Sequence, residues 1–317
     1  MIRFLIKEGG QLKELEEPKK SCWINITPPF VQEELLKLAD NLDIPLDFLL
    51  DSLDIDERSR YEREEDIKLI LVNTPVLNKS DIDNDAMYIT VPIGIVLTDE
   101  HIITITSYVN PVLQLFLEGK VKNFNPSDKS SFVLQLLEQN VYHFLTCLKK
   151  LNTTRNLVER ELYNSSRNQD LRRLLNIEKS LVYFLNSLSS NELLKMKMKR
   201  SDFLGIRDDE HKTDLFEDII IDNSQALEMA NVYTNILNGT MEAYASIISN
   251  NLNVVIQGLT LVTIIISVPT LIASLFGMNV LLPFKSDDNP YMFFYIVIFS
   301  IIVSLLLAWW FRRKRLF

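Results

Sequence analysis

The sequence predicts an α/β domain that is followed by long α-helices and a C-terminal hairpin of two transmembrane helices. Three observations support this fold class. Segments rich in Ile, Val and Thr alternate with helical segments in the first third of the chain. Glycine and proline almost disappear between Lys129 and Pro269. Residues 243–284 contain no Asp, Glu, Lys, Arg or His, which is typical of a membrane-spanning segment.

The hairpin is predicted from two apolar segments near the C-terminus. Residues 254–276 would form a helix of about 35 Å, and a bilayer core is about 30 Å thick. A polar loop, 277–290, separates it from a second apolar segment, 291–311, which ends in Trp309 and Trp310. A basic tail, 312–317, contains Arg312, Arg313, Lys314 and Arg315.

The part before the hairpin is predicted to consist of three segments: a cytosolic α/β domain at 1–128, a cytosolic helical hairpin at 129–212, and the cytosolic part of a long pore helix at 213–253. The expected strands are 3–7, 22–26, 67–73, 87–91, 94–98 and 102–106, and the expected helices are 29–41, 45–52, 130–162 and 170–199. Apolar residues from Phe216 to Ile248 recur at alternating fours and threes, which predicts a coiled-coil seam. We expect that seam to continue the membrane path into the cytosol.

The first apolar helix carries a stripe of polar side chains. Their spacing of three and four places them on one helix face. The stripe consists of Thr260, Thr263, Ser267, Thr270 and Ser274, and Asn253 and Ile256 extend it. Small hydroxyl residues often pack membrane helices together and bond to their own carbonyls. A stripe through the full membrane depth also fits a pore-lining, water-exposed face. A two-crossing chain cannot enclose such a path alone, so more than two copies in a cyclic homo-oligomer are expected.

Composition restricts the function classes. The net charge of −9 argues against nucleic-acid binding and suits a protein that meets divalent cations. Two separated cysteines and three scattered histidines predict free thiols and no zinc or heme site of His and Cys. Neither a phosphate-binding glycine loop nor a nucleophile–base pair is visible, so we expect no organic cofactor and no enzyme activity.

The topology follows from the ends of the chain. The N-terminus has no secretory signal, and the basic tail is a positive-inside signal. We therefore expect a multi-pass protein of the cell membrane, in contact with the lipid bilayer, with both termini in the cytoplasm and the loop 277–290 outside.

Two charged segments allow different interpretations. Residues 54–66 could be a regulatory cation site, or a solvated loop with local ion pairs, which the charge pattern favours. Residues 80–85 resemble the start of a calcium loop but lack its Gly and Glu, so a hairpin turn is predicted there.

Gly277-Met278-Asn279 follows Phe276 at the outer end of the first membrane helix. In this place the tripeptide resembles the motif of the CorA family of divalent-cation transport proteins. The segments 246–253, 267–270, 54–66 and 92–99 also resemble the family, so the likeness extends over the whole chain.

The resemblance implies a funnel-shaped homopentamer in which the first membrane helix lines a central channel and Gly277, Met278 and Asn279 form the selectivity filter. It also implies uptake of Mg²⁺, and of Co²⁺, by passive flow driven by the membrane potential. Regulatory Mg²⁺ would bind between cytosolic domains, at Asp218 and, on the neighbouring subunit, Asp99. The chain departs from the family where Leu282-Pro283-Phe284-Lys285 replaces a Met-Pro-Glu-Leu run.

Three alternatives stay open at this point. A zinc transporter of the same fold would share the tripeptide, although no Cys or His lies on the stripe. A membrane-anchored coiled-coil scaffold would explain the hairpin but not the stripe. Asp218 is also explained as an acid in the first turns of a helix, where the helix dipole favours it.

Overall fold

The computed structural model describes residues 1–9, 11–29, 31–78, 86–164, 168–278 and 291–314. The chain divides into two compact units, 1–240 and 241–317, and each is described by itself. The predicted turn at 80–85 and the predicted filter residue Asn279 lie outside the described residues.

The first unit is built on a seven-stranded sheet. In chain order the strands are β1 (Ile2–Glu8), β2 (Gln11–Leu15), β3 (Trp23–Ile26), β4 (Arg60–Glu64), β5 (Ile67–Leu77), β6 (Tyr88–Leu97) and β7 (Ile102–Ile105). Their spatial order is β2-β1-β3-β7-β6-β5-β4. Only β3 and β7 pair in parallel, and the other neighbours are antiparallel.

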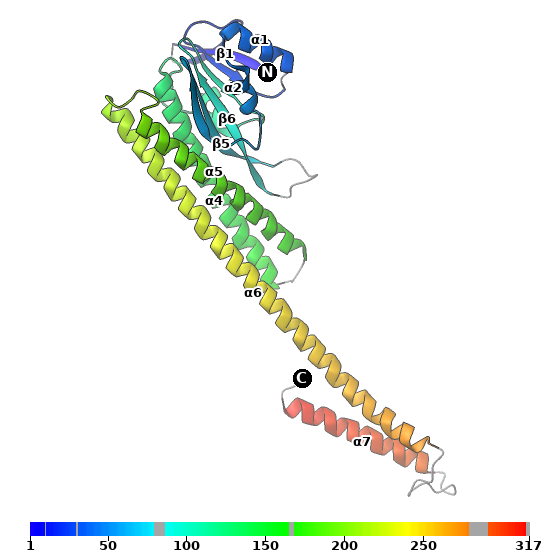
Figure 1. Cartoon of the computed structure of the whole chain (residues 1–317). Coiled ribbons are helices and arrows are strands. Elements are labelled where there is room, and N and C mark those ends of the chain that lie inside the picture. The colour runs from blue at the N-terminus through cyan, green and yellow to red at the C-terminus, as the bar shows by residue number, and fades with distance from the viewer. Residues whose placement is uncertain (10, 30, 79–85, 165–167, 279–290, 315–317) are drawn as a thin grey trace. The chain divides into compact units, whose positions relative to one another are not determined.

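Helices cover both faces of this sheet (Figure 1). On one face α1 (Gln32–Leu42) and α2 (Leu46–Asp51) pack on Leu69, Leu71 and their neighbours. On the other face α3 (Pro111–Leu117), α4 (Lys129–Asn164) and α5 (Asn168–Ser201) bury Ile70 and Val72. Because alternate residues of a strand point to opposite faces, β5 is apolar on both sides and reads as an almost continuous hydrophobic segment.

The structure confirms the α/β class and corrects some elements. The segments 87–91 and 94–98 form one strand, β6, with Gly94 inside it. A Cβ at Gly94 would lie 1.8 Å from Ser52 Oγ at the end of α2, so only glycine admits α2 this close to the sheet. The strands β2 and β4 and the helix α3 were not predicted.

Helix α6 (Glu210–Phe276) begins in the first unit. Its predicted seam is buried there inside the chain: Phe216, Asn223, Ala230 and Leu237 are each at most 2 % exposed. Asn223 contacts Lys195 of α5 through a hydrogen bond of 2.6 Å. These four members of the seam therefore pack within their own chain. That the seam continues the membrane path stays a prediction.

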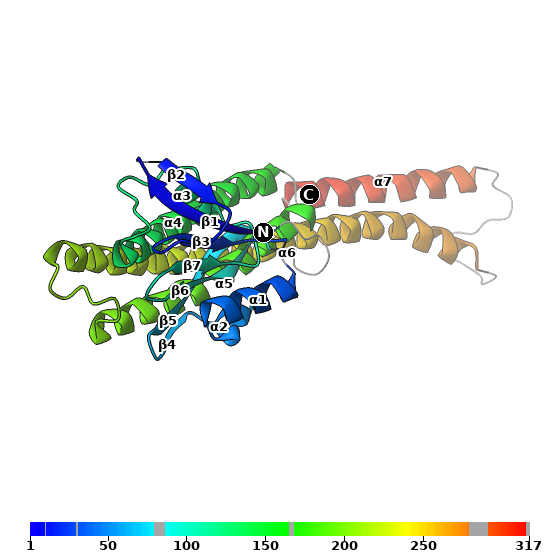
Figure 2. The ribbon, with the colours of Figure 1, turned by 90° about the horizontal axis from the view of Figure 1, so that it is seen from above.

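The second unit contains the C-terminal part of α6 and the helix α7 (Met292–Arg313), which run side by side (Figure 2). Both helices are long and apolar enough to cross a membrane. Pro269 lies inside α6 and has no N–H to donate to the carbonyl of Ile265. Ser304 Oγ of α7 lies 3.5 Å from that carbonyl and 3.0 Å from the carbonyl of Ser300 in its own helix, so its one proton is shared between the two acceptors.

Candidate functional site

The polar stripe of α6 faces away from α7. Leu261 is 7 % exposed and Ile265 is half-buried, and the bond from Ser304 places this side of α6 against α7. At 3.6 residues per turn, Thr263, Ser267, Thr270 and Ser274 lie on the opposite side of the helix. All seven predicted stripe residues, from Asn253 to Ser274, are exposed in the single chain.

Four of the five stripe hydroxyls share one hydrogen-bond arrangement. They donate to the carbonyl four residues earlier in the helix: Thr260 to Ile256 at 2.8 Å, Thr263 to Leu259 at 2.8 Å, Ser267 to Thr263 at 2.7 Å and Thr270 to Ile266 at 3.0 Å. A hydroxyl that has donated its proton keeps its oxygen lone pairs as acceptors. The stripe therefore presents acceptors without fixed charge, which suit the water shell of a cation.

The stripe also lies along a groove of about 660 Å³. Thr263, Ser267, Thr270 and Ser274 share its lining with apolar residues on their flanks, including Ile264 and Leu271. Sequence spacing identified the polar members but not these flanking residues, because an apolar side chain in a membrane helix fits a lipid-facing position equally well.

Gly277 and Met278 lie at the end of α6, and both are exposed. The N–H of Gly277 donates to the carbonyl of Ala273 at 2.9 Å, which continues the helical bonding. A Cβ at position 277 would lie 3.3 Å from that same carbonyl oxygen, so glycine relieves a tight approach at the helix end.

Helix α6 also has exposed positions in the first unit. Gly239, Val232, Gln225 and Asp218 follow one another at intervals of seven residues, and each is exposed. The buried row of Phe216, Asn223, Ala230 and Leu237 follows the same repeat on another face. A helix with one row buried in its own chain and another left open is suited to packing against further copies.

The two predicted regulatory residues lie on different elements. Asp218 is exposed on α6, with Asp214 and Asp222 exposed one turn before and after it. Asp99 is exposed in the turn between β6 and β7, where its backbone carbonyl accepts a hydrogen bond of 2.6 Å from Lys129 Nζ. Asp99 lines a depression with Asp43, Asp66 and Glu100. The residues that line this depression do not include Asp218.

The charged segment 54–66 contains several ion pairs. Arg60 pairs with Asp51 at 2.7 Å, with Glu62 at 3.0 Å and with Glu57. Arg63 lies 3.8 Å from Asp66. These contacts agree with the interpretation of local ion pairs, although residues 60–64 form an edge strand instead of a loop. Among the described residues, no group of three or more His, Cys, Asp or Glu side chains is placed to hold a metal ion.

Comparisons with known proteins bear on this site. The family model described as "CorA-like Mg2+ transporter protein" matches residues 18–313. A cobalt/magnesium transport protein CorA of Methanocaldococcus jannaschii is 27 % identical over 267 residues, which are 83 % of this chain and 81 % of that protein.

Solved structures are similar over nearly the full length. The complete structure of the CorA magnesium transporter from Methanocaldococcus jannaschii matches this chain with a TM-score of 0.80 and 25 % sequence identity. The match covers 99 % of this chain and 98 % of the chain in that structure. The structure of full-length CmaX matches with a TM-score of 0.69 and 16 % sequence identity, over 99 % of this chain and 97 % of that chain. At this identity the match shows the fold alone. Because the family model matches nearly the whole chain, the protein belongs to the CorA-like Mg²⁺ transporter family.

Proposed function

We propose that the protein is a passive uptake channel for Mg²⁺, and for Co²⁺, in the cell membrane. The observation that carries this proposal is the polar stripe of α6, which is exposed on the side away from α7 and bonded so that its oxygens act as acceptors. The relative from Methanocaldococcus jannaschii, which is named for cobalt and magnesium transport, supports the choice of ions.

The ion path needs several copies of the chain. One stripe can form only one side of a water-filled path, and α7 lies on the other side of α6 from it. A closed ring of identical subunits would surround the path with stripes, and the exposed positions Gly239, Val232, Gln225 and Asp218 would be available for contacts with further copies. Family membership supports a funnel-shaped pentamer, with both termini in the cytoplasm and the loop 277–290 outside.

The selectivity filter in this proposal consists of Gly277, Met278 and Asn279. Mg²⁺ gives up its water reluctantly, so a ring of carbonyl and amide oxygens would hydrogen-bond the hydrated ion. The acceptors of Thr260, Thr263, Ser267 and Thr270 would continue this lining without a charge that traps the ion. A divalent ion that enters down a potential of 100 mV gains about 4.6 kcal/mol, so transport needs no covalent chemistry.

Regulation in this proposal comes from Mg²⁺ bound between subunits. Asp218 of one copy and Asp99 of its neighbour would supply the carboxylates, and both are exposed and available in the single chain. Binding would stabilise the closed state and so reduce uptake when internal Mg²⁺ is plentiful.

The proposal is tested by ion flux into liposomes that contain the purified full chain. Mg²⁺, Co²⁺, Ni²⁺ and Zn²⁺ are compared with and without an inside-negative potential. Mg²⁺ and Co²⁺ entry that increases with the potential is expected. Entry of Zn²⁺ in preference to Mg²⁺ would favour a zinc transporter of the same fold, and no entry of any cation would favour the membrane-anchored scaffold.

A further inference from the structure

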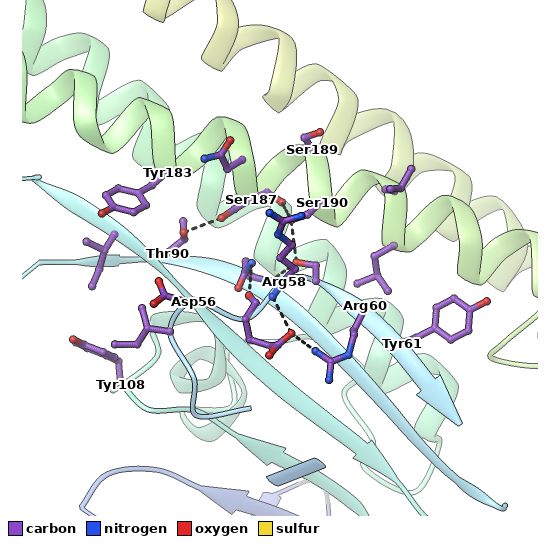
Figure 3. A pocket seen from close by; sticks show the side chains of 18 of the residues that line it. Asp56, Arg58, Arg60, Tyr61, Thr90, Tyr108, Tyr183, Ser187, Ser189 and Ser190 are labelled. Atoms are coloured by element: carbon purple, nitrogen blue, oxygen red, sulfur yellow. Dashed lines mark hydrogen bonds and ion pairs between the residues drawn. The ribbon is translucent and has the colours of Figure 1, made fainter. Parts of the chain in front are cut away.

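A cavity in the first unit shares no lining residue with the polar stripe. It has a volume of about 1060 Å³ and opens between the charged segment before β4, the strands β5 and β6, and the helix α5 (Figure 3). That volume is enough for a ligand of nucleotide size. None of the features used for the transport proposal lies in it.

Two cations that line the cavity have no side-chain partner among the described residues. Arg60 is bound by Asp51, Glu57 and Glu62. By contrast, the side chains of Arg58 and Lys197 form no hydrogen bond or ion pair with the residues that the structure describes, and both line the cavity. Figure 3 places Arg58 in the middle of the cavity, below Ser187 and Ser190 of α5. Unpaired cations beside hydroxyl groups favour an anion such as phosphate.

A buried acceptor also lines the cavity without a partner. Asn73 is only 8 % exposed, and its Oδ1 has no hydrogen-bond partner in the part of the chain that the structure describes. Its backbone is held on both sides, because its N–H donates to Asn191 Oδ1 at 3.0 Å and its carbonyl accepts from Asn140 Nδ2 at 2.9 Å. An unsatisfied buried acceptor is costly, so this position favours a ligand that brings an N–H or O–H donor.

One end of the cavity is aromatic and acidic. Tyr108 and Tyr183 lie at the same end, with Asp56 beside Tyr108, and Arg58 lies farther along. A flat aromatic ring can stack on tyrosine, and a carboxylate accepts from ring amino groups. An anion alone would use Arg58 but neither the tyrosines nor the volume.

We propose that this cavity binds a nucleotide, with the base at Tyr108, Tyr183 and Asp56 and a phosphate at Arg58. Lys197 would attract further phosphates, and Asn73 would accept from a hydroxyl or amino group of the ligand. This inference does not rest on the transport proposal, because the site uses none of the same residues and its test measures binding alone.

The test is calorimetric titration of the purified full chain in detergent with ATP, AMP, adenosine and inorganic phosphate, with EDTA and again with Mg²⁺. ATP or AMP is expected to bind, with adenosine and phosphate each at least about tenfold weaker. Arg58→Gln should weaken ATP binding by about tenfold or more, and Tyr108→Leu should weaken ATP but not phosphate.

Matched controls exclude a general effect of charge. Arg172 and Lys179 are exposed on α5, outside the cavity, so Arg172→Gln and Lys179→Gln should bind ATP like the unmodified chain. Because Arg58 is exposed and unpaired, its replacement should leave the thermal unfolding temperature unchanged. The proposal is overturned if no nucleotide binds, if phosphate binds as well as ATP, or if Arg58→Gln binds ATP as tightly as Arg172→Gln does.

Discussion

Lys195 of α5 donates from Nζ to Asn223 Oδ1 of α6 at 2.6 Å, and both side chains are completely buried. Asn223 is also a donor, from Nδ2 to the carbonyl of Leu188 at 3.0 Å. Burial lowers the pKa of Lys195 to about 7, and the nearby charge of Glu192 opposes this shift only in part. A titratable group therefore lies within the contact between α5 and the helix that leads to the membrane.

The first prediction is that the contribution of Lys195 to the stability of the first unit increases with pH between about 7 and 10. An unfolded lysine keeps its proton up to about pH 10.4, whereas the folded Lys195 releases it near 7. Between these values the unfolded state binds more protons, so stability rises with pH. Lys195→Met should reduce that slope by on the order of 1 kcal/mol per pH unit. Thermal unfolding from pH 7 to 9.5 measures it.

The control for this prediction is Lys179→Met, an exposed lysine of the same helix. It should keep the pH dependence of the unmodified chain. Equal slopes for Lys195→Met and the unmodified chain would show that Lys195 keeps its proton when buried.

Helix α6 shows which part of the fold could be predicted from sequence. The spacing from Phe216 to Leu237 correctly identified a packed face, because apolar periodicity depends only on helix geometry. It could not identify the partner, since the same repeat fits a neighbouring subunit or α5. The burial of Lys195 could not be predicted from the sequence, because lysine is rarely buried and is normally assigned to the surface.

The edges of the sheet were missed for a physical reason. The strand β4 consists of Arg60–Glu64, and a run of charges favours a solvated loop unless one knows that β5 pairs with it. In the candidate site the hydroxyl positions were predictable from spacing of three and four. Their orientation relative to α7 was not, because it depends on contacts such as that of Ser304 with Ile265.

The second prediction concerns acid conditions. Lys212 Nζ lies 2.9 Å from Asp128 Oδ2, which joins the start of α6 to the start of α4. Burial raises the pKa of Asp128, but bonds from the Ser131 N–H, Lys212 and the Ser131 and Ser130 hydroxyls outweigh it and hold the pKa at about 2. The stabilisation is present above about pH 4 and is lost as pH falls towards 2.

Asp128→Asn should therefore destabilise the chain at pH 6 and have less effect near pH 2.5. Because the Asp128 side chain is 41 % exposed, the loss should be about 1 kcal/mol or less. Chemical unfolding at the two pH values measures it, with Asp40→Asn, at an exposed residue of α1, as control. A loss that is the same at both pH values would contradict an ionic contribution.

The third prediction is that water reaches the stripe in the assembled protein. Single cysteines at Thr263, Ser267, Thr270 and Ser274 should react with a charged thiol reagent, and cysteines at Leu261 and Ile265 should not. Both native cysteines are buried, so the unmodified chain should not react with the reagent and serves as the blank.

Cysteines on α7 serve as the control that distinguishes exposure to lipid from exposure to water. Phe299 and Leu306 are 57 % and 59 % exposed in the single chain, and they should face lipid in the membrane. Cysteines at these positions should not react with the charged reagent. Equal labelling of the stripe and of α7 would refute the assignment of the stripe to the ion path.

The fourth prediction is that Asn279 acts on the ion and not on the fold. Asn279→Ala should lower Mg²⁺ flux in liposomes by at least about tenfold, because the filter loses an uncharged acceptor. Its oligomer size on gel filtration should not change. Asn289→Ala, in the same loop, is the control and should keep its flux. Normal flux through the assembled Asn279→Ala protein would place selectivity elsewhere.

The fifth prediction concerns regulation through Asp218. A cation that binds only the closed state stabilises it by about 2.7 kcal/mol per site at a hundredfold excess over the dissociation constant. Several sites in one ring would together bias a shared gate strongly. Asp218→Asn should therefore permit flux at internal Mg²⁺ levels that stop the unmodified channel, and it should reduce the protection that Mg²⁺ gives the first unit against limited proteolysis.

The neighbouring acids supply the decisive controls. Asp214 and Asp222 are exposed one helical turn before and after Asp218, so Asp214→Asn and Asp222→Asn remove the same charge from the same part of α6. If Mg²⁺ only screened a negative surface, all three variants would lose protection equally. If Mg²⁺ is bound at a defined site, only Asp218→Asn should lose both protection and inhibition. A variant at Asp218 that keeps both would place the sensor at another position.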